Sequence, residues 1–274
     1  MKITSRKKII NLKNTIIMGI LNATPDSFFD GNKYNKVSKA IDKARKMIYE
    51  GAKIIDVGGQ STRPGYKKIS SEEEIERVYP IISAIRKRFD VFISLDTFRY
   101  EVVKNCSNLI DMINDVHSFS KKESLNLANK FGFPICIVHN KKIKKNSNIF
   151  EEVKNFFVEK IFFCKKYGIK KKNIIIDPGF GFKKTLLQNY QILSNLHFLD
   201  FFKVPILIGI SRKSMVGKIV KKSVENRLFG SLSCAIIASL QNANIIRTHD
   251  VKETVESIKI VHTIKKIKEK NAKK

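Results

Sequence analysis

The chain has few cysteines and no tryptophan. Its four cysteines, at positions 106, 136, 164 and 234, form no C-x-x-C pair and have no nearby histidine at metal-ligand spacing. This pattern argues against a disulfide framework and against a zinc motif. The cysteines fall in stretches that we expect to be strands or helices. We therefore interpret them as small buried side chains of a protein in a reducing, cytoplasmic compartment.

Long apolar runs are missing as well. The first run, Ile16–Leu21, is too short for a signal-peptide core and ends at Asn22 without a small-residue cleavage site. No run reaches membrane-spanning length, and we expect no membrane partner. No linker rich in Gly, Ser or Pro divides the 274 residues, a usual length for one eight-unit barrel. We therefore expect one soluble domain over residues 1–274, with a frayed basic tail from about residue 265.

Acidic residues are scarce. The 25 Asp and Glu stand against 53 Lys and Arg, which gives a formal net charge of +28. Such a charge could neutralise phosphates, so a nucleic-acid partner is one interpretation. The basic residues are mostly lysines, however, and they are spread over every expected helix instead of forming one stripe with arginines and aromatic residues. We favour solvated helix faces and expect no nucleic-acid partner.

What the chain does contain is a repeated pattern of short apolar runs that end in polar or ionisable residues. The clearest is Lys53–Gly65, in which an isoleucine-rich run passes into an acid, two glycines and a polar loop. A parallel strand buried on both faces has this composition, and Gly and Pro mark the loop that follows it. Seven further runs share the pattern: Ile17–Asn22, Phe92–Asp96, Met112–Asp115, Ile135–His139, Ile174–Gly179, Ile206–Lys213 and Ile245–Asp250.

Stretches with helical periodicity separate these runs. We expect helices over roughly 37–50, from a serine cap near Ser70, over 150–167 and over 227–241. Alternating strands and helices predict a parallel sheet, and eight such units close into a barrel. We therefore predict an α/β fold, a single-domain (β/α)8 TIM barrel. An open doubly wound sheet is the alternative, but no G-x-G-x-x-G follows the first strand, and polar residues end all eight strands.

The active site of such a barrel lies at the C-terminal ends of its strands. Asp96, Asn114 and Asp177 stand there and offer carboxylate and amide groups. One buried carboxylate can accept a ring N–H and an exocyclic amine together, so this set suits a nitrogen-rich heterocycle. Lys213 directly follows a buried strand, where a core lysine would be costly.

A second set combines two guanidiniums, an imidazole and an amide oxygen: Arg63, Arg247, His249 and Asn22. Barrels commonly bind phosphate after their last two strands, so this set predicts a phosphate site. Magnesium prefers oxygen ligands and keeps several waters, so Asn22 and substrate phosphates could hold Mg²⁺. No Ser-His-Asp arrangement or activated cysteine is present. We expect catalysis by positioning and electrostatics without a covalent enzyme intermediate.

Structural roles are open for several of these polar residues. Asp56 and Asp115 could be internal hydrogen-bond acceptors that tie loops. His139 could be a structural histidine with satisfied hydrogen bonds. The role of Phe182 could be packing alone. The sequence leaves these alternatives undecided.

Five collinear segments resemble the signature segments of the bacterial dihydropteroate synthase family: Met18–Phe28, Asp56–Gly65, Asp177–Phe182, Gly209–Ser214 and Arg247–Val251. The resemblance implies a transferase of folate biosynthesis. It would condense (7,8-dihydropterin-6-yl)methyl diphosphate with 4-aminobenzoate to 7,8-dihydropteroate and pyrophosphate. It further implies a dissociative mechanism, in which pyrophosphate leaves before the amine captures the pterin cation. A cytoplasmic homodimer that sulfonamides inhibit is also implied.

The resemblance also implies roles for single residues. Asn22 would hold Mg²⁺, and Arg63, Lys213 and Asp96 would be catalytic. The pterin diphosphate would contact Thr62, Asp96, Asn114, Asp177, Lys213, Arg247 and His249. The 4-aminobenzoate pocket would be lined by Arg63, Pro64, Phe182, Lys213 and Ser214. Two departures stand out: Gln60 replaces a usual glutamate, and the segment Val138–Lys142 reads Val-His-Asn-Lys-Lys where the family usually reads Met-His-Met followed by Gln or Arg and Gly.

Two alternatives to a synthase stay open at this point. One is a related pterin-barrel methyltransferase, which would share the heterocycle pocket but should not need Lys213 or the pair Arg247 and His249. The other is a decayed barrel without catalytic activity, which the charge and the altered loop after Val138 suggest. Ligand binding and turnover distinguish all three.

Overall fold

The eight isoleucine-rich runs form the parallel strands of a (β/α)8 barrel, as predicted. The computed structural model describes residues 1–6, 8–24, 33–60, 68–144 and 147–272. Neighbouring strands pair in the order β8-β7-β6-β5-β4-β3-β10-β9, and a parallel bridge between Ile176 and Ile206 joins the two outer strands. The strands are β3 (Ile16–Asn22), β4 (Ile54–Gly58), β5 (Phe92–Asp96), β6 (Met112–Asp115), β7 (Ile135–Val138), β8 (Ile174–Asp177), β9 (Leu207–Ile208) and β10 (Ile245–Thr248).

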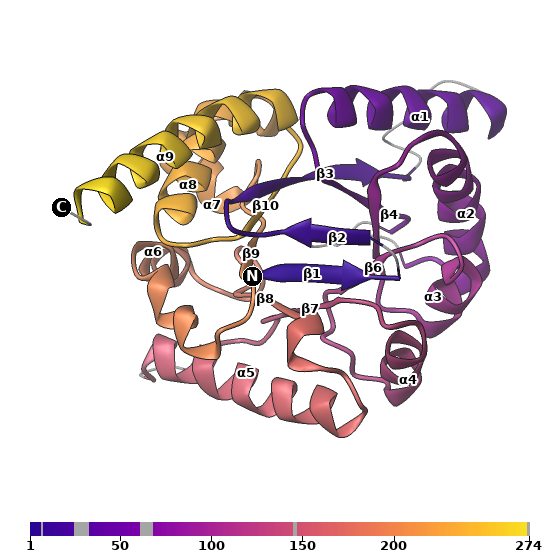
Figure 1. The fold of residues 1–274 in the computed structure, drawn as a ribbon, viewed down its shortest axis with the longest axis horizontal. Helices are drawn as coiled ribbons and strands as arrows, with labels where there is room; N and C mark the ends of the chain where they lie inside the picture. Colours follow the sequence, from indigo (N-terminus) through magenta and orange to yellow (C-terminus); the bar gives the residue numbers. More distant parts are fainter. Residues whose placement is uncertain (7, 25–32, 61–67, 145–146, 273–274) are drawn as a thin grey trace.

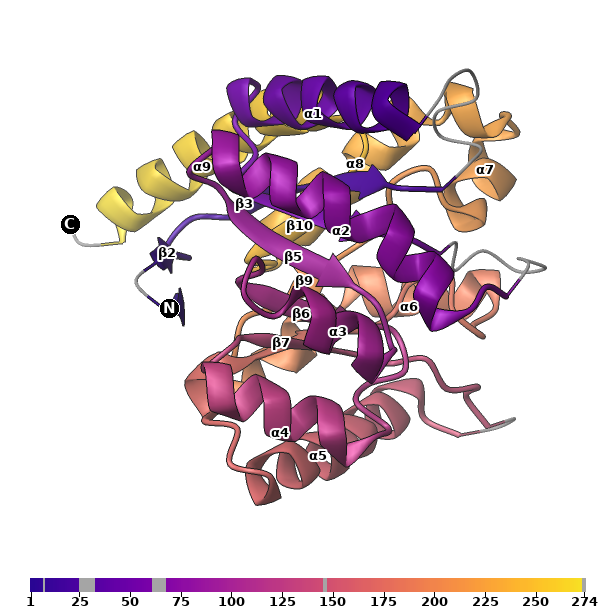
Figure 2. The same cartoon turned by 90° about the vertical axis from the view of Figure 1, so that its right-hand side faces the viewer.

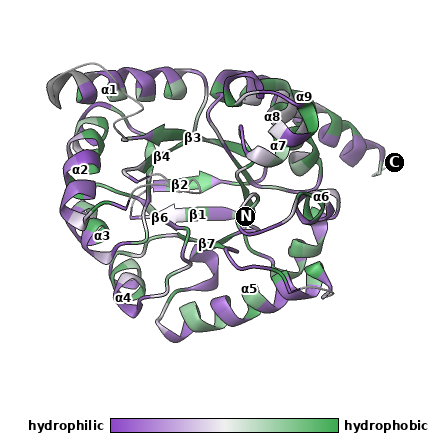
Figure 3. Cartoon of the chain, turned by 180° about the vertical axis from the view of Figure 1, so that it is seen from behind, coloured by the Kyte–Doolittle hydropathy of each residue, from purple (hydrophilic) through white to green (hydrophobic). Residues whose placement is uncertain are grey.

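The strands are apolar throughout because both of their faces are buried. Side chains alternate between the two faces of a strand, so Ile54 packs inside the barrel and Ile55 packs against the outer helices. Figure 3 shows β3 mostly in the hydrophobic colour, whereas the outer helices α1 and α5 carry both colours. Polar residues within or directly after such strands are therefore exceptional, and they mark the end of the barrel that carries chemistry.

The helices surround the strands (Figure 1). Ser70 caps α2 as predicted, because its hydroxyl accepts from the Glu73 N–H at 3.1 Å. Gly168 takes a left-handed φ of 82° just after α5. The helices are α1 (Lys33–Tyr49), α2 (Ser71–Arg88), α3 (Tyr100–Cys106), α4 (Lys122–Phe131), α5 (Ile149–Lys166), α6 (Leu186–Ser194), α7 (Ser214–Val220), α8 (Leu228–Leu240) and α9 (Val251–Asn271).

An N-terminal hairpin closes one mouth of the barrel, which the sequence did not predict. The antiparallel strands β1 (Lys2–Ser5) and β2 (Lys8–Asn11) lie across the barrel in Figure 1. Ile3 and Leu12 are fully or almost fully buried and belong to the apolar cluster inside the barrel. In Figure 2 the strands β3 and β5 point away from this hairpin. The C-terminal ends of the strands are therefore at the other mouth.

The C-terminal helix is longer than expected. The sequence predicted a frayed tail from about residue 265, but α9 continues to Asn271. Its last turns are mostly exposed, so the helix continues without a packed face there. None of the described helices is long and apolar enough to cross a membrane.

Candidate active site

Strand ends bring the predicted heterocycle set together at the open mouth. Asp96 ends β5, Asn114 lies in β6 and Asp177 ends β8. Lys213 stands directly before α7, and its ammonium group interacts electrostatically with Asp177, Asp96 and Arg247. Asn114 and Asp177 are each only 6% exposed. Residues that are far apart in the sequence therefore form one buried, charged cluster.

Arg247 from β10 lies at the centre of this cluster. Its Nε donates to Asp56 Oδ2 at 2.6 Å and its Nη2 donates to Asp96 Oδ2 at 2.7 Å. Asn114 Nδ2 also donates to Asp56 Oδ2, at 3.2 Å. The carboxylate of Asp56 is fully buried and fixes both neighbours. Two carboxylates thus hold the Arg247 side chain inside the barrel. Only part of its guanidinium remains available to bind a ligand.

Burial sets the protonation of the acids in this cluster. It raises the pKa of Asp96 well above its usual range; Asp56 adds to this shift, and Arg247 opposes it. Burial also raises the pKa of Asp177, against the attraction of Lys213. One Asp177 oxygen accepts from the Gly179 N–H at 2.7 Å. The second oxygen is therefore the one that can accept from the N–H groups of a heterocycle.

Lys213 and Phe182 lie in contact, which agrees with the expectation that both line the 4-aminobenzoate pocket. The ammonium group of Lys213 stands 4.5 Å from the centre of the Phe182 ring and donates to the Phe180 carbonyl at 2.5 Å. Burial lowers the pKa of Lys213 to about 8. Ser214 begins α7 beside it and is exposed. This side of the mouth combines a cation, an aromatic face and an accessible hydroxyl.

His249 follows β10 and is held by hydroxyl groups. Its Nδ1 lies 3.0 Å from the Ser211 Oγ, and its backbone N–H donates to the same oxygen at 3.2 Å. Burial and the charge of Arg247 lower the pKa of His249 to about 3. The imidazole is therefore neutral at physiological pH. Next to it, Arg212 forms a two-bond ion pair with Asp250.

Asn22 is the one predicted metal ligand. It ends β3, is partly exposed and pairs in register with Gly58. Over the described ranges, no group of three or more His, Cys, Asp and Glu is placed to hold a metal ion. A single amide oxygen fits a Mg²⁺ ion that takes its other ligands from water and substrate phosphates.

Three predicted residues cannot be placed. Thr62, Arg63 and Pro64 lie outside the described residues, so their roles stay predictions. The residues before and after them are held by Arg99, whose Nη2 donates to the Gln60 side-chain oxygen at 2.7 Å and to the Ile69 carbonyl at 2.6 Å. The amide oxygen of Gln60 is thus sufficient to accept from Arg99, although a glutamate is usual in the family it resembles.

The structural interpretation of Asp115 agrees with the fold, whereas that of His139 as a satisfied histidine does not, because its buried Nδ1 has no hydrogen-bond partner among the described residues. Asp115 accepts from the backbone N–H groups of His117 and Phe119, so it ties the loop after β6. His139 is buried with its ring edge-on to Phe156, at 4.7 Å between centres. Burial lowers the pKa of His139 to about 3, which keeps it neutral.

Sequence analysis assigned no active-site role to three residues that shape this mouth. Asp56 was left undecided, although an acid at an inward position of a buried strand was a usable signal. Ser211 and Lys184 gave no signal. Lys184 donates to the carbonyl oxygens of His139 at 2.9 Å and Gly179 at 3.0 Å, but the sequence does not distinguish it from the many surface lysines.

Comparisons with known proteins place the chain in a family. The pterin binding enzyme family matches residues 18–249. The curated dihydropteroate synthase of Escherichia coli K12 is 43% identical over 98% of both chains, and that of Clostridium beijerinckii is 42% identical over 96% of this chain and 99% of its own.

Solved structures indicate the same family. The Yersinia pestis dihydropteroate synthase in a sulfonamide drug complex superposes with a TM-score of 0.91 at 40% identity, covering 97% of this chain and 100% of that one. The Xanthomonas albilineans enzyme with 4-aminobenzoic acid gives 0.92 at 34% identity, covering 96% and 98%. The buried acids, the lysine and the arginine at the open mouth thus occur in a chain that belongs to the pterin-binding enzymes and, among them, to the dihydropteroate synthases.

Proposed function

We propose that this chain condenses (7,8-dihydropterin-6-yl)methyl diphosphate with 4-aminobenzoate to give 7,8-dihydropteroate and pyrophosphate. The observation that carries the proposal is the cluster of Asp96, Asn114, Asp177 and Lys213 around Arg247. Buried carboxylates and an amide recognise the donors and acceptors of a pterin ring, whereas a site for phosphate alone would not place carboxylates there.

The pterin ring binds with its N–H and amine groups toward Asp177, whose second oxygen is free of the Gly179 bond. Asn114 supplies an amide whose orientation is fixed by Asp56. Lys213 then faces the pterin from the side of Phe182. These groups are positioned before substrate arrives, which reduces the reorganisation that binding requires.

The reaction breaks the bond between the pterin methylene carbon and the diphosphate oxygen, and the electron pair leaves with the diphosphate. His249 and the part of the Arg247 guanidinium that Asp56 and Asp96 do not occupy bind the anion that departs. The amine of 4-aminobenzoate attacks the methylene cation, forms the C–N bond and loses a proton. Within the described part of the site there are anion ligands and no Ser-His-Asp arrangement or activated cysteine, which fits capture of a cation better than a covalent enzyme intermediate.

We place 4-aminobenzoate against Phe182, Lys213 and Ser214, with Arg63 and Pro64 completing the pocket. The Lys213 ammonium lies over one face of the Phe182 ring, so a flat aromatic acid can lie beside the pair with its carboxylate near this cation or the Ser214 hydroxyl. A sulfonamide with the same shape competes for this position.

Magnesium would be held by Asn22 and by the substrate diphosphate, where it would neutralise phosphate charge. We also propose a cytoplasmic homodimer. Apolar side chains on three neighbouring helices support this: Leu187 on α6, Ile219 on α7 and Phe229 on α8 are 68%, 56% and 81% exposed. If these side chains form one contiguous apolar patch, it would be unusual on a monomer surface. Sedimentation velocity of wild type and of Phe229→Lys tests it, with a monomeric variant expected.

Formation of dihydropteroate by the purified protein tests the function. Product should form from both substrates, should stop when a chelator removes Mg²⁺, and should return when Mg²⁺ is added. A sulfonamide should compete with 4-aminobenzoate and not with the pterin diphosphate. A folded protein that binds a methylated tetrahydropterin and makes no dihydropteroate would support the methyltransferase alternative instead.

A further inference from the structure

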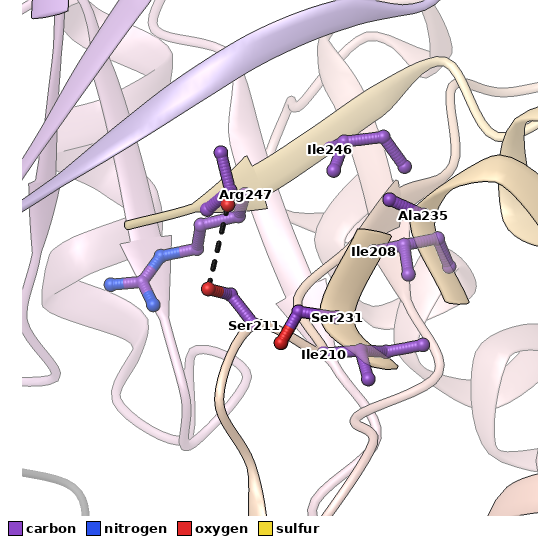
Figure 4. A pocket seen from close by; sticks show the side chains of 8 residues that line it. Ile208, Ile210, Ser211, Ser231, Ala235, Ile246 and Arg247 are labelled. Atoms are coloured by element: carbon purple, nitrogen blue, oxygen red, sulfur yellow. Dashed lines mark hydrogen bonds between the residues drawn. The ribbon is translucent and has the colours of Figure 1, made fainter. Parts of the chain in front are cut away.

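The imidazole of His249 is held by a chain of hydroxyl groups that the reaction scheme does not use. Ser211, in the loop after β9, lies 3.0 Å from its Nδ1, and the Thr248 hydroxyl donates to Ser211 at 3.4 Å, which is the dashed line in Figure 4. Thr248 in turn accepts from the Asp250 N–H at 3.2 Å. Arg212 fixes Asp250 through its ion pair. The chain therefore runs from an ion pair to one nitrogen of the imidazole.

The hydrogen bonds of Ser211 determine the direction of its own proton. A hydroxyl has one proton and two lone pairs. Its oxygen accepts from the backbone N–H of His249 at 3.2 Å, whereas its contact with the Thr248 hydroxyl, at 3.4 Å, is too long to compete for its proton. The hydroxyl proton is then directed to Nδ1 of His249, which lies nearer, at 3.0 Å. A nitrogen that accepts this proton carries none of its own.

The surroundings keep the imidazole neutral. Among the described residues, the positive charges of Arg247, Lys43 and Arg212 act on His249, and the negative charge of Asp250 opposes them. A second proton on the ring would add a cation to this group in a buried place. A neutral ring with Nδ1 unprotonated must carry its proton on Nε2.

We infer that Ser211 is a positioning residue that fixes His249 as the neutral Nε2–H tautomer, so that the imidazole presents a hydrogen-bond donor to the diphosphate. The inference rests on the proposed function for the identity of the anion, but the tautomer does not depend on it. A donor on Nε2 binds phosphate oxygen, whereas a lone pair there would repel it. The anion site thus includes a neutral donor beside the charged Arg247.

The tautomer can be measured directly on protein labelled with ¹⁵N in its five histidines. Two-bond proton–nitrogen spectra distinguish a protonated from an unprotonated ring nitrogen, and His249→Gln assigns the signal. We expect Nδ1 of His249 to be unprotonated in the wild type and the ring to become a mixture of tautomers in Ser211→Ala. A protonated Nδ1 in the wild type, or an unchanged spectrum in the variant, would overturn the inference.

Ser231→Ala is the matched control. Ser231 and Ser211 line the same void of about 10 Å³, and Figure 4 shows both beside it. Ser231 accepts from the Arg212 N–H and donates to the Arg227 carbonyl, with no bond to His249. Its loss should leave the His249 signals as they are. A change equal to that in Ser211→Ala would assign the effect to packing and contradict the inference.

Kinetics supply a second readout. Because one neutral hydrogen bond to the imidazole is lost, Ser211→Ala should raise the KM for the pterin diphosphate and the inhibition constant of pyrophosphate by about three- to tenfold. The KM for 4-aminobenzoate should not change, and Ser211→Thr, which keeps a hydroxyl, should recover most of the loss. Equal effects on both substrates would contradict the role. An inactive wild type with the expected tautomer would refute the proposed function and leave the tautomer assignment standing.

Discussion

Arg247 and Asp56 are 191 positions apart in the sequence, yet the Nε of one lies 2.6 Å from the Oδ2 of the other. The strands β10 and β4 that carry them are each paired to β3, so the ion pair spans three neighbouring strands. It links the predicted diphosphate group to the predicted heterocycle group, because Asp56 also holds Asn114. The two halves of the site are therefore built as one network.

Asp56→Asn should test the strength of this network. Removal of one partner of a buried ion pair leaves the other charge without full compensation, so we expect a loss of about 3 kcal/mol in the free energy of unfolding. Urea denaturation measures it. Asp42→Asn is the control, since the Asp42–Arg45 pair has 61% and 60% exposed side chains and should contribute almost nothing. Equal losses in the two variants would contradict a structural role for the Arg247 pair.

The affinity for the pterin diphosphate should depend on Lys213. Burial lowers the pKa of Lys213 to about 8, so the side chain is charged below that pH and neutral above it. If the charge contributes to binding, the dissociation constant should be constant below pH 8 and rise above it, by up to about tenfold per pH unit. Calorimetric titration from pH 6.5 to 9.5 measures this. In Lys213→Arg the rise should be absent, because arginine keeps its charge; the same rise in that variant would exclude Lys213 as its origin.

His139 should make the fold sensitive to acid. Its folded pKa is about 3 against 6.5 for an ordinary histidine, because burial disfavours the charged ring. The unfolded chain therefore binds the proton first, and the stability present above pH 6.5 is lost as the pH falls toward 3. Thermal unfolding at pH 7 and pH 4.5 should show a smaller loss of stability in His139→Gln than in the wild type. Parallel losses in both would mean that other groups cause the acid sensitivity.

Arg63 lies outside the described residues, and its role is a prediction from the resemblance alone. If it acts when the cation is captured, Arg63→Ala should lose turnover far more than affinity for the pterin diphosphate. Rapid-quench turnover and equilibrium binding measure the two quantities separately. An equal loss of both would mean that Arg63 only binds substrate.

The barrel could be predicted from the sequence because each strand repeats one strong local pattern. Asp96 and Asp177 were found for the same reason: a charged residue at the end of an apolar run is visible in one dimension. The hairpin of β1 and β2 could not be found in this way. Its strands have four residues each, and Ile3 is buried only because the barrel mouth lies beneath it.

The partners of Arg247 were not predictable for a related reason. Its sequence position indicates only that it stands at a strand end. That its guanidinium binds the carboxylates of Asp56 and Asp96, and is not fully available to phosphate, depends on how the strands pair around the barrel. Ser211 acts on His249 through a contact between two loops, which no spacing in the sequence encodes. The sequence thus predicted which residues stand at the strand ends, but the hydrogen-bond partners of these residues could be seen only in the fold.

The most direct test of this account is the rate of dihydropteroate formation by the wild type, Asp177→Ala and Asp200→Ala. Asp177 is 6% exposed at the open mouth, whereas Asp200 is an exposed acid that accepts from Asn242. We predict product from the wild type and from Asp200→Ala at similar rates, and a loss of at least about a hundredfold in Asp177→Ala, since a charged hydrogen-bond acceptor for the pterin is removed. No product from a folded wild type, or an unchanged rate in Asp177→Ala, would contradict the account.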